Sequence, residues 1–316
     1  EDQGQFHNLG LAVVDEQHRF GVAQRAKLWE KSEVPPHVLV MTATPIPRTL
    51  AMTAYGDLDY SIMDELPPGR IPITTVHRNE NSRSQVMDFI KAEIQKGRQA
   101  YIIFPLIEES EKMDYENLMK GYENVKAYFP EPNYWISMVH GKMKNDQKEA
   151  NMQRFVQKDT QIMVSTTVIE VGVNVPNATV MVIESAEKFG LSQLHQLRGR
   201  VGRGGEKSYC ILLTGNKLST EARERLNMMC ATNDGFAIAE KDLEIRGPGD
   251  IEGTRQSGML NFKLASIVQD KHLLDLAKKL AENLINEDPE LDAAVNQKLK
   301  DYLQKQKGQT SWSKIS

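Results

Sequence analysis

Short runs of consecutive apolar residues recur along the chain, and longer segments with helical spacing of apolar positions separate most of them. Such a run is typical of a strand that is buried on both faces of a parallel sheet. Alternation of these strands with helices predicts an α/β fold in which helices connect parallel strands. The expected strands are residues 11–14, 37–41, 73–77, 99–104, 137–140, 162–165, 179–184 and 209–213, and the expected helices are residues 21–32, 82–97, 112–129 and 144–158.

Cap and turn residues suggest where elements and domains end. Ser82 and Gln85 predict a capping box at the start of one helix, and Gly97 is expected near its end. The run Pro67-Pro68-Gly69-Arg70-Ile71-Pro72 is stiff and non-helical, so residues 67–72 are interpreted as an interdomain linker. We expect residues 1–66 to be the C-terminal part of a first lobe, 73–215 a complete second lobe, and 216–316 a region whose amphipathic helices, at 267–285 and 290–303, pack back on the rest.

Composition and net charge limit the kinds of partner, disulfide and membrane segment that the chain can have. The formal net charge is −4, so any contact with nucleic acid must be local and does not come from a general basic field. Cys210 and Cys230 are too few for a disulfide framework and are expected to be reduced thiols of the core. No apolar run approaches the ~20 residues of a membrane span. The missing initial methionine and the small first lobe predict that the chain is a portion of a longer protein.

Three arginines stand close together in the glycine-rich segment 190–204, namely Arg198, Arg200 and Arg203. A guanidinium keeps its charge at working pH and binds phosphate oxygens two at a time. Such a cluster suits phosphoryl transfer, which depends on positioning and on stabilising spread negative charge. A solvated basic end of a helix is the alternative interpretation.

Polar residues also follow several expected strands, at the edge where ligands gather in parallel sheets. Asp15 and Glu16 are suited to hold a hydrated Mg²⁺ ion and to polarise a water molecule, although a plain polar turn has the same pattern. Thr42 and Thr44 are either sensors of nucleotide state or a helix cap. The loops at 164–176 and 140–143 are suited to contacts with phosphate or a nucleic-acid backbone, but each alone is an ordinary loop pattern.

The order of these segments carries more information than any one of them. Between residues 15 and 203 the chain contains, in order, Asp-Glu-Gln-His, Thr-Ala-Thr-Pro, His-Gly, Ser-Thr-Thr…Glu-Val-Gly-Val and Gln-Leu-Arg-Gly-Arg-Val-Gly-Arg. The series resembles motifs II to VI of superfamily 2 helicases and translocases. That resemblance implies RecA-like P-loop NTPase lobes with ATP and Mg²⁺ in the cleft between them, the second lobe complete here and the first truncated.

The resemblance also implies a role for each motif residue. Asp15 and Glu16 would hold the metal, with Glu16 as the catalytic base, and His18 would couple nucleotide to DNA. Gln196, Arg200 and Arg203 would reach the γ-phosphate, the two arginines as arginine fingers. Thr166 would contact DNA, and the remaining residues assigned to ATP binding and coupling are Thr42, Thr44, Glu170 and Gly172.

Further segments narrow the resemblance to the branch of superfamily 2 that contains RecG and the transcription-repair coupling factor Mfd. These are Thr-Pro-Ile-Pro-Arg-Thr at 44–49, Gly-Leu-Ser-Gln-Leu-His at 190–195 and the stretch from 233 to 258. The last resembles the translocation (TRG) motif of both, in which Arg246, Arg255 and Gln256 are suited to grip phosphates. Gln17, the segment 104–111 and the Thr-Arg-Gln-Ser-Gly ending favour the RecG family.

Two departures from the family pattern matter. The sequence has no Gly-x-x-x-x-Gly-Lys-[Ser/Thr] loop, so we expect this chain alone not to hydrolyse ATP. Asn174 stands where many relatives have aspartate, and its amide carries no charge.

The resemblance therefore implies part of an ATP-dependent translocase on double-stranded DNA that acts on stalled forks and Holliday junctions in recombination and repair. Branched DNA and the single-stranded DNA-binding protein are the expected partners. A monomer, in the bacterial cytoplasm at the nucleoid and without a membrane partner, is the expected state. An Mfd-like translocase and a non-catalytic DNA-binding module are the alternatives.

Overall fold

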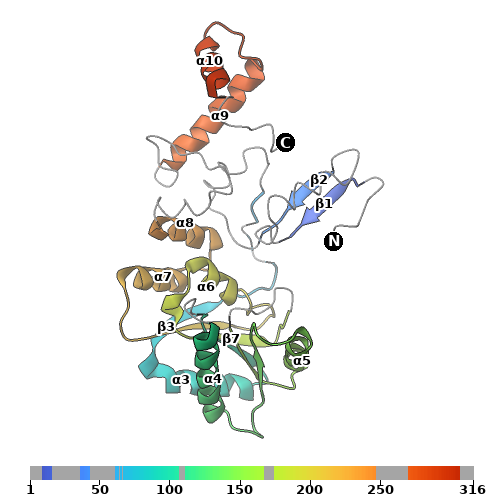
Figure 1. The fold of residues 1–316 in the computed structure, drawn as a ribbon, viewed down its shortest axis with the longest axis vertical. Coiled ribbons are helices and arrows are strands. Elements are labelled where there is room, and N and C mark those ends of the chain that lie inside the picture. Colours follow the sequence, from blue (N-terminus) through green and yellow to red (C-terminus); the bar gives the residue numbers. More distant parts are fainter. Residues whose placement is uncertain are drawn as a thin grey trace. The chain divides into compact units, whose positions relative to one another are not determined.

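The computed structural model of the chain describes residues 9–15, 36–42, 61–63, 65, 67–106, 111–166, 174–246 and 270–306. The described elements include a two-stranded sheet, a six-stranded sheet with helices on both faces, and two helices toward the C-terminus (Figure 1). This organisation confirms the predicted fold class, α/β with a parallel sheet and a helical C-terminal region.

The two-stranded sheet pairs β1 (Leu11–Val14) with β2 (His37–Val40) in parallel. Both strands were predicted from their apolar runs. Burial on both faces was not confirmed, because Leu11, Val13 and Leu39 are 58%, 54% and 50% exposed and only Val14 is buried. Two paired strands cover little of their own faces, and the predicted helix at 21–32 lies outside the described residues.

The six-stranded sheet contains β3 (Thr74–Asn79), β4 (Gln99–Ile103), β5 (Ile136–Val139), β6 (Ile162–Ser165), β7 (Ala178–Ile183) and β8 (Tyr209–Thr214). The strands run in the order β3-β8-β7-β4-β6-β5, and every neighbouring pair is parallel. Every residue of β4, β6 and β7 is buried, which explains why these strands have continuous apolar runs.

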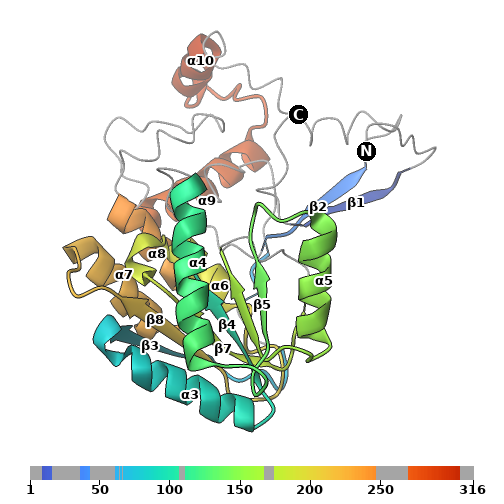
Figure 2. The ribbon, with the colours of Figure 1, turned by 60° about the horizontal axis from the view of Figure 1, so that its bottom comes forward.

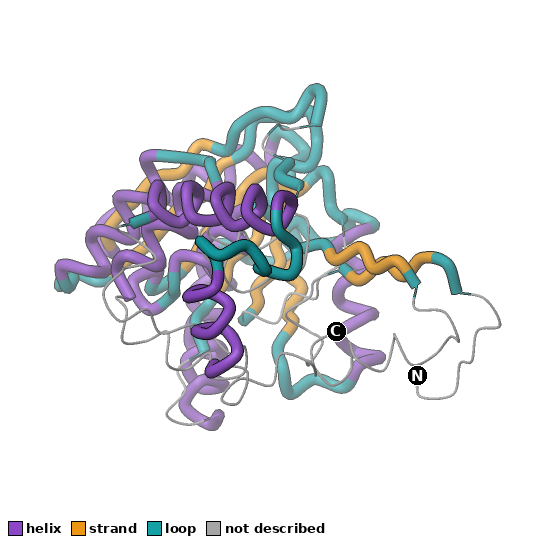
Figure 3. The backbone as a smooth tube through the Cα atoms, turned by 90° about the horizontal axis from the view of Figure 1, so that it is seen from above, coloured by secondary structure: helices purple, strands orange, loops and turns teal. Residues whose placement is uncertain are grey.

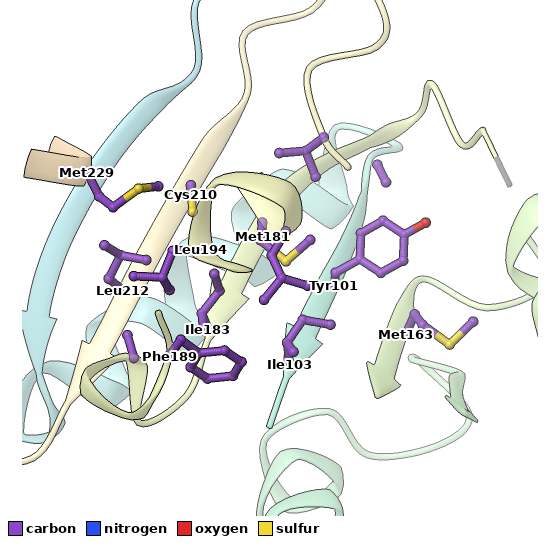
Figure 4. Packing of buried hydrophobic residues seen from close by; sticks show 14 of the residues in the cluster. Tyr101, Ile103, Met163, Met181, Ile183, Phe189, Leu194, Cys210, Leu212 and Met229 are labelled. Atoms are coloured by element: carbon purple, nitrogen blue, oxygen red, sulfur yellow. The ribbon is translucent and has the colours of Figure 1, made fainter. Parts of the chain in front are cut away.

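Side chains of the central strands alternate between two cores, one on each face of the sheet. Tyr101 and Ile103 of β4 point to one face, where α5 (Asn145–Val156) and α6 (Leu191–Arg198) pack (Figure 4). The alternate residues of β4 point to the other face, where α3 (Arg83–Gln95) and α4 (Glu111–Tyr128) pack (Figure 2).

The start of α3 differs from the prediction. A 3₁₀ turn, η2 (Glu80–Ser82), precedes it, and the Ser82 side chain makes no capping hydrogen bond. The Ser82 hydroxyl donates to Asn79 Oδ1 instead, at 3.4 Å, so the predicted capping box is wrong. The expected end is confirmed, because α3 stops at Gln95 and Gly97 follows with φ +79°.

Three helices after β7 were not predicted. They are α6, α7 (Thr220–Ala231) and α8 (Gly235–Arg246), and a second 3₁₀ turn, η3 (Ala186–Lys188), precedes α6. Leu226 and Met229 of α7 and Ile238 of α8 join the same core as α6. Figure 3 shows helices around the sheet in a view from above.

The two C-terminal helices are α9 (Lys271–Glu287) and α10 (Gln297–Gln306). The second begins seven residues later than predicted, because Asp288 organises a turn first. Its carboxylate accepts hydrogen bonds from the backbone N–H groups of Asp292 and Ala293 and from the Asn296 side chain. These bonds hold the pKa of Asp288 below its usual range.

The two cysteines lie in different environments. Cys210 is fully buried in β8, and burial raises the pKa of its thiol to about 12. Cys230 is exposed, so the prediction that both are core thiols is wrong for Cys230. No helix in the part of the chain that the structure describes is long and apolar enough to cross a membrane.

Candidate functional site

The arginine-rich segment lies at the amino-terminal edge of the six-stranded sheet. Helix α6 buries Leu191, Leu194 and Leu197 against the sheet and ends at Arg198. The segment that follows meets residues that immediately precede strands. A Cβ on Gly202 would lie 2.8 Å from Ile73 Cγ1, before β3, and one on Gly204 would lie 2.9 Å from the Pro176 carbonyl oxygen, before β7. Both positions therefore require glycine, and Gly202 also has φ +72°.

Arg198 is a structural residue, although it was grouped with the other two arginines by sequence. It is buried, and its Nη1 donates to the carbonyl oxygens of Met229 and Thr232 at 3.0 and 2.7 Å. Its Nη2 lies 2.9 Å from His195 Nδ1, which must accept, since a guanidinium has only donors. Arg198 thus ties α6 to the end of α7, and the interpretation of all three arginines as phosphate ligands is wrong for Arg198.

His195 is held neutral in this arrangement. Burial, and then the charge of Arg198, lower the pKa of His195 to about 4. A neutral imidazole can accept the hydrogen bond from Arg198, whereas a protonated ring would repel it.

Arg200 and Arg203 are placed differently from Arg198. Arg200 is half-buried and Arg203 is exposed, with its Nε donating to the Gly199 carbonyl oxygen at 3.2 Å. Both guanidiniums act on the hydroxyl of the buried Tyr101. Burial raises the pKa of Tyr101 to about 12, against an opposing effect of the two positive charges. Gln196 lies exposed on α6, one turn before Arg200.

Contacts on several sides fix the backbone of the loop that carries Arg200 and Arg203. The Arg70 Nε donates to the Gly202 carbonyl oxygen at 3.1 Å, and Gly204 packs on Pro176. At the far end, Arg98 bridges Glu206 and the buried Glu93, with both N···O distances at 2.6 Å. Lys96 also contacts Glu93, and these hydrogen bonds lower the pKa of Glu93 against the effect of its burial.

Thr166 lies at the opposite edge of the same sheet, directly after β6. The residue is buried, and its hydroxyl oxygen has no hydrogen-bond partner among the described residues. The neighbouring Ser165 hydroxyl donates to the Thr166 carbonyl oxygen at 2.8 Å. A buried hydroxyl without a partner costs free energy, so it is a candidate for binding a ligand at this edge.

Other residues at this edge are engaged with each other. Arg83 and the buried Glu184 form a two-pronged ion pair at 2.5 and 2.7 Å, which sequence reasoning missed. Glu184 ends the apolar run of β7, and a carboxylate in that position was the signal that could have found it. His140 packs its ring edge-to-face with Tyr115, and Lys142 lies 5.7 Å from the centre of the Tyr115 ring.

The two-stranded sheet presents Asp15 and Thr42 at the same edge. Asp15 directly follows β1 and Thr42 follows β2, and the Met41 N–H donates to the Val14 carbonyl oxygen at 2.7 Å. Both Asp15 and Thr42 are exposed. Among the described residues, no three His, Cys, Asp or Glu side chains converge in a metal-binding group.

Comparison with known proteins identifies the family of the chain. The family model of the helicase conserved C-terminal domain matches residues 82–205, and that of domain 3, C-terminal, of ATP-dependent DNA helicase RecG matches residues 232–316. RecG of Synechocystis sp. is 56% identical over 93% of the chain, and RecG of Escherichia coli (strain K12) is 51% identical over 90% of it. The chain belongs to the RecG family. It spans 35% and 41% of the length of these two curated relatives.

Solved structures support the same assignment. A RecG bound to a three-way DNA junction matches 86% of this chain, and 34% of its own chain, with 42% identity and a TM-score of 0.65. The DUF1998 helicase MrfA, bound to DNA and AMPPNP, matches 83% of this chain and 43% of its own, with 15% identity and a TM-score of 0.51, so it shows the fold alone. The resemblance to the RecG family that the motifs predicted is confirmed.

The structure of this RecG-family chain brings together only some of the predicted site residues. Gln196, Arg200 and Arg203 share one edge of the six-stranded sheet, and Thr166 lies at the other. Asn174 is exposed. Arg246 ends α8, but its side chain is not described. The predicted residues outside the described part are Glu16, His18, Thr44, Glu170, Gly172, Arg255 and Gln256.

Proposed function

We propose that this chain is the C-terminal part of a RecG-type motor that couples ATP hydrolysis to movement along double-stranded DNA. The observation that carries the proposal is the loop after α6, whose backbone is held at one edge of the six-stranded sheet by the Arg70 hydrogen bond, the packing of Gly202 and Gly204, and the Glu206 ion pair. Fixed guanidiniums stabilise the charge of a transferring phosphoryl group without further reorganisation. Gln196, one helical turn before Arg200, is the third group on the nucleotide side.

The remaining residues fit a Mg²⁺ ion that accompanies the nucleotide. Mg²⁺ keeps most of its water and is held by one or two carboxylates, and the exposed Asp15 at the end of β1 offers one of them. Glu16 is the second and the general base that orients the attacking water. When bound, ATP with Mg²⁺ supplies the transferable phosphoryl group. Coupling between nucleotide and DNA is assigned to His18, Thr42, Thr44, Glu170 and Gly172.

The DNA side of the proposal rests on Thr166. Its hydroxyl lies at the edge opposite the arginines, which supports a DNA contact at a different edge of the sheet from the nucleotide. Arg246, Arg255 and Gln256 extend the DNA contacts as translocation residues. Stalled forks and Holliday junctions are the proposed substrates. We further propose that the protein acts as a monomer with single-stranded DNA-binding protein as a partner, in the bacterial cytoplasm at the nucleoid.

The 316 residues contain no Gly-x-x-x-x-Gly-Lys-[Ser/Thr] loop to cradle the nucleotide phosphates. We therefore expect the chain alone not to hydrolyse ATP, and a chain extended upstream through such a loop to do so. DNA-stimulated ATP hydrolysis measured on both chains, with branched DNA, tests this directly.

In the extended chain, Arg200→Ala should lower kcat about 100-fold or more, because it removes a charge that acts on the transferring group. Arg154→Ala is the matched control, since Arg154 is an exposed arginine on α5, and it should leave kcat unchanged. Salt-dependent DNA binding without any effect of DNA or Arg200 on hydrolysis would instead favour a DNA-binding module without motor activity.

A further inference from the structure

The linker before β3 is bound directly to the loop that carries the arginines. Pro67 to Arg70 form a tight turn that the Arg70 N–H closes onto the Pro67 carbonyl oxygen at 3.1 Å. Pro68 at the second position and Gly69 at the third, with φ +81°, are the residues that a type II turn requires. The backbone direction at Arg70 is therefore fixed by the turn, and so is the origin of its side chain.

The Arg70 side chain then reaches a residue 132 positions away in sequence. Its half-buried Nε donates to the Gly202 carbonyl oxygen at 3.1 Å. This carbonyl belongs to the peptide that joins Gly202 to Arg203. A hydrogen bond to it fixes the orientation of that peptide plane, and with it the direction in which the Arg203 side chain leaves the backbone.

Two neighbouring residues, Ile73 and Thr74, also contact this loop, but at different atoms from Arg70. Ile73, the residue directly after the linker, fills the space that a side chain at position 202 would need. The Thr74 N–H donates to the Ser208 carbonyl oxygen at 3.0 Å and starts the pairing of β3 with β8. The linker contacts the loop at Gly202 and the first residue of β3 contacts it at Ser208, but only the contact at Gly202 lies next to an arginine of the proposed site.

We propose that Arg70 is a positioning residue that sets the orientation of the Gly202–Arg203 peptide and so transmits the conformation of the linker to Arg203. The proposal rests on the proposed function, because Arg203 has a catalytic part only in a phosphoryl-transfer motor. Arg70 itself touches no substrate. It acts through the carbonyl oxygen before Arg203, so any change in the linker between two lobes reaches this arginine through one hydrogen bond.

The structural half of the proposal can be tested on this chain as it is. Arg70→Ala should raise the rate of amide hydrogen exchange in peptides that cover residues 199–205, by about 10-fold, because the loop loses one of its attachments. Arg154→Ala should leave the same peptides unchanged. Equal exchange rates in Arg70→Ala and the unsubstituted chain would overturn the proposal.

The functional half needs the chain extended through a phosphate-binding loop, and a double-mutant cycle decides it. Arg70→Ala should lower kcat for DNA-stimulated ATP hydrolysis about 10-fold and change KM for ATP by less than about 2-fold, because only the orientation of Arg203 changes. If Arg70 acts through Arg203, the Arg70→Ala/Arg203→Ala enzyme should have the same kcat as Arg203→Ala alone. Losses that multiply would show that Arg70 acts independently and would overturn the proposal.

A conservative variant separates positioning from charge. Arg70→Lys keeps the positive charge but lacks the planar Nε donor, so it should lose as much kcat as Arg70→Ala. Full activity of Arg70→Lys would contradict the positioning role. If Arg203→Ala has no effect while Arg200→Ala abolishes hydrolysis, the inference fails and the proposed function stands. If neither arginine matters, the proposed function fails as well.

Discussion

At the scale of single residues, the three arginines of one short segment have three environments. Arg198 is buried and holds two carbonyl oxygens, Arg200 is half-buried, and Arg203 is exposed. The sequence contained the information that separates Arg198, because it shares a helical face with Leu191 and Leu194, at spacings of seven and four residues. The hydrogen bond of Arg70 to Gly202 and the effect of the arginine charges on Tyr101 could not be predicted, since both depend on tertiary structure alone.

Arg198→Ala should lower the free energy of unfolding of this chain by about 2–4 kcal/mol, because it leaves the Met229 and Thr232 carbonyl oxygens without a buried donor and opens a cavity. Urea unfolding followed by circular dichroism measures the change. Arg154→Ala, which removes an exposed arginine, should change the same quantity by less than about 0.5 kcal/mol. A loss for Arg198→Ala no larger than that of the control would contradict the structural role.

At the scale of elements, the strands were predictable and several helices were not. Buried parallel strands need apolar side chains on both faces, so their runs are plain in the sequence. Helix α8 contacts the core on one side without a clear apolar stripe, and α6 is only eight residues long. The predicted cap at Ser82 failed because a 3₁₀ turn takes up the chain before α3. The predicted domain boundaries stay predictions.

A close contact between α4 and the end of β4 gives a prediction at this scale. A Cβ on Gly121 would overlap the ring of Phe104, so the ring must move to admit it. Gly121→Ala should therefore lower the free energy of unfolding by about 1–3 kcal/mol. Adding Phe104→Leu to Gly121→Ala should restore part of the loss. Thermal or urea unfolding of the single and double variants measures both, and a Gly121→Ala chain as stable as the original would refute the contact.

At the scale of the whole molecule, the six-stranded sheet separates two sets of predicted site residues. Arg200 and Arg203 lie at the amino-terminal edge, and Thr166 lies at the carboxyl-terminal edge. The motif order along the sequence does not reveal this separation, because motifs adjacent in sequence can lie at opposite ends of a strand. The assignment of these residues to nucleotide and DNA stays a prediction.

Because the two sets of residues lie at different edges, we expect a substitution at one edge to affect DNA binding or ATP hydrolysis without affecting the other. In a chain extended through the phosphate-binding loop, Thr166→Ala should raise the DNA concentration needed for half-maximal ATP hydrolysis about 3–10-fold and leave KM for ATP unchanged. Its hydroxyl is the group proposed to contact DNA. Thr166→Ser, which keeps the hydroxyl, should behave like the unsubstituted protein. A change in KM for ATP without a change in the DNA requirement would place Thr166 on the nucleotide side.

Thr166 and Pro176 lie at opposite edges of the sheet, and Pro176 touches Gly204. The distance between the two edges of the sheet is about the length of one strand, which is roughly 16 Å for five residues. Protein interiors are packed as densely as organic crystals and have low compressibility, so a displacement at one side of the sheet is transmitted to the other. A rigid-body rotation of the sheet about an axis between its two edges therefore moves the carboxyl-terminal edge and the amino-terminal edge in opposite directions.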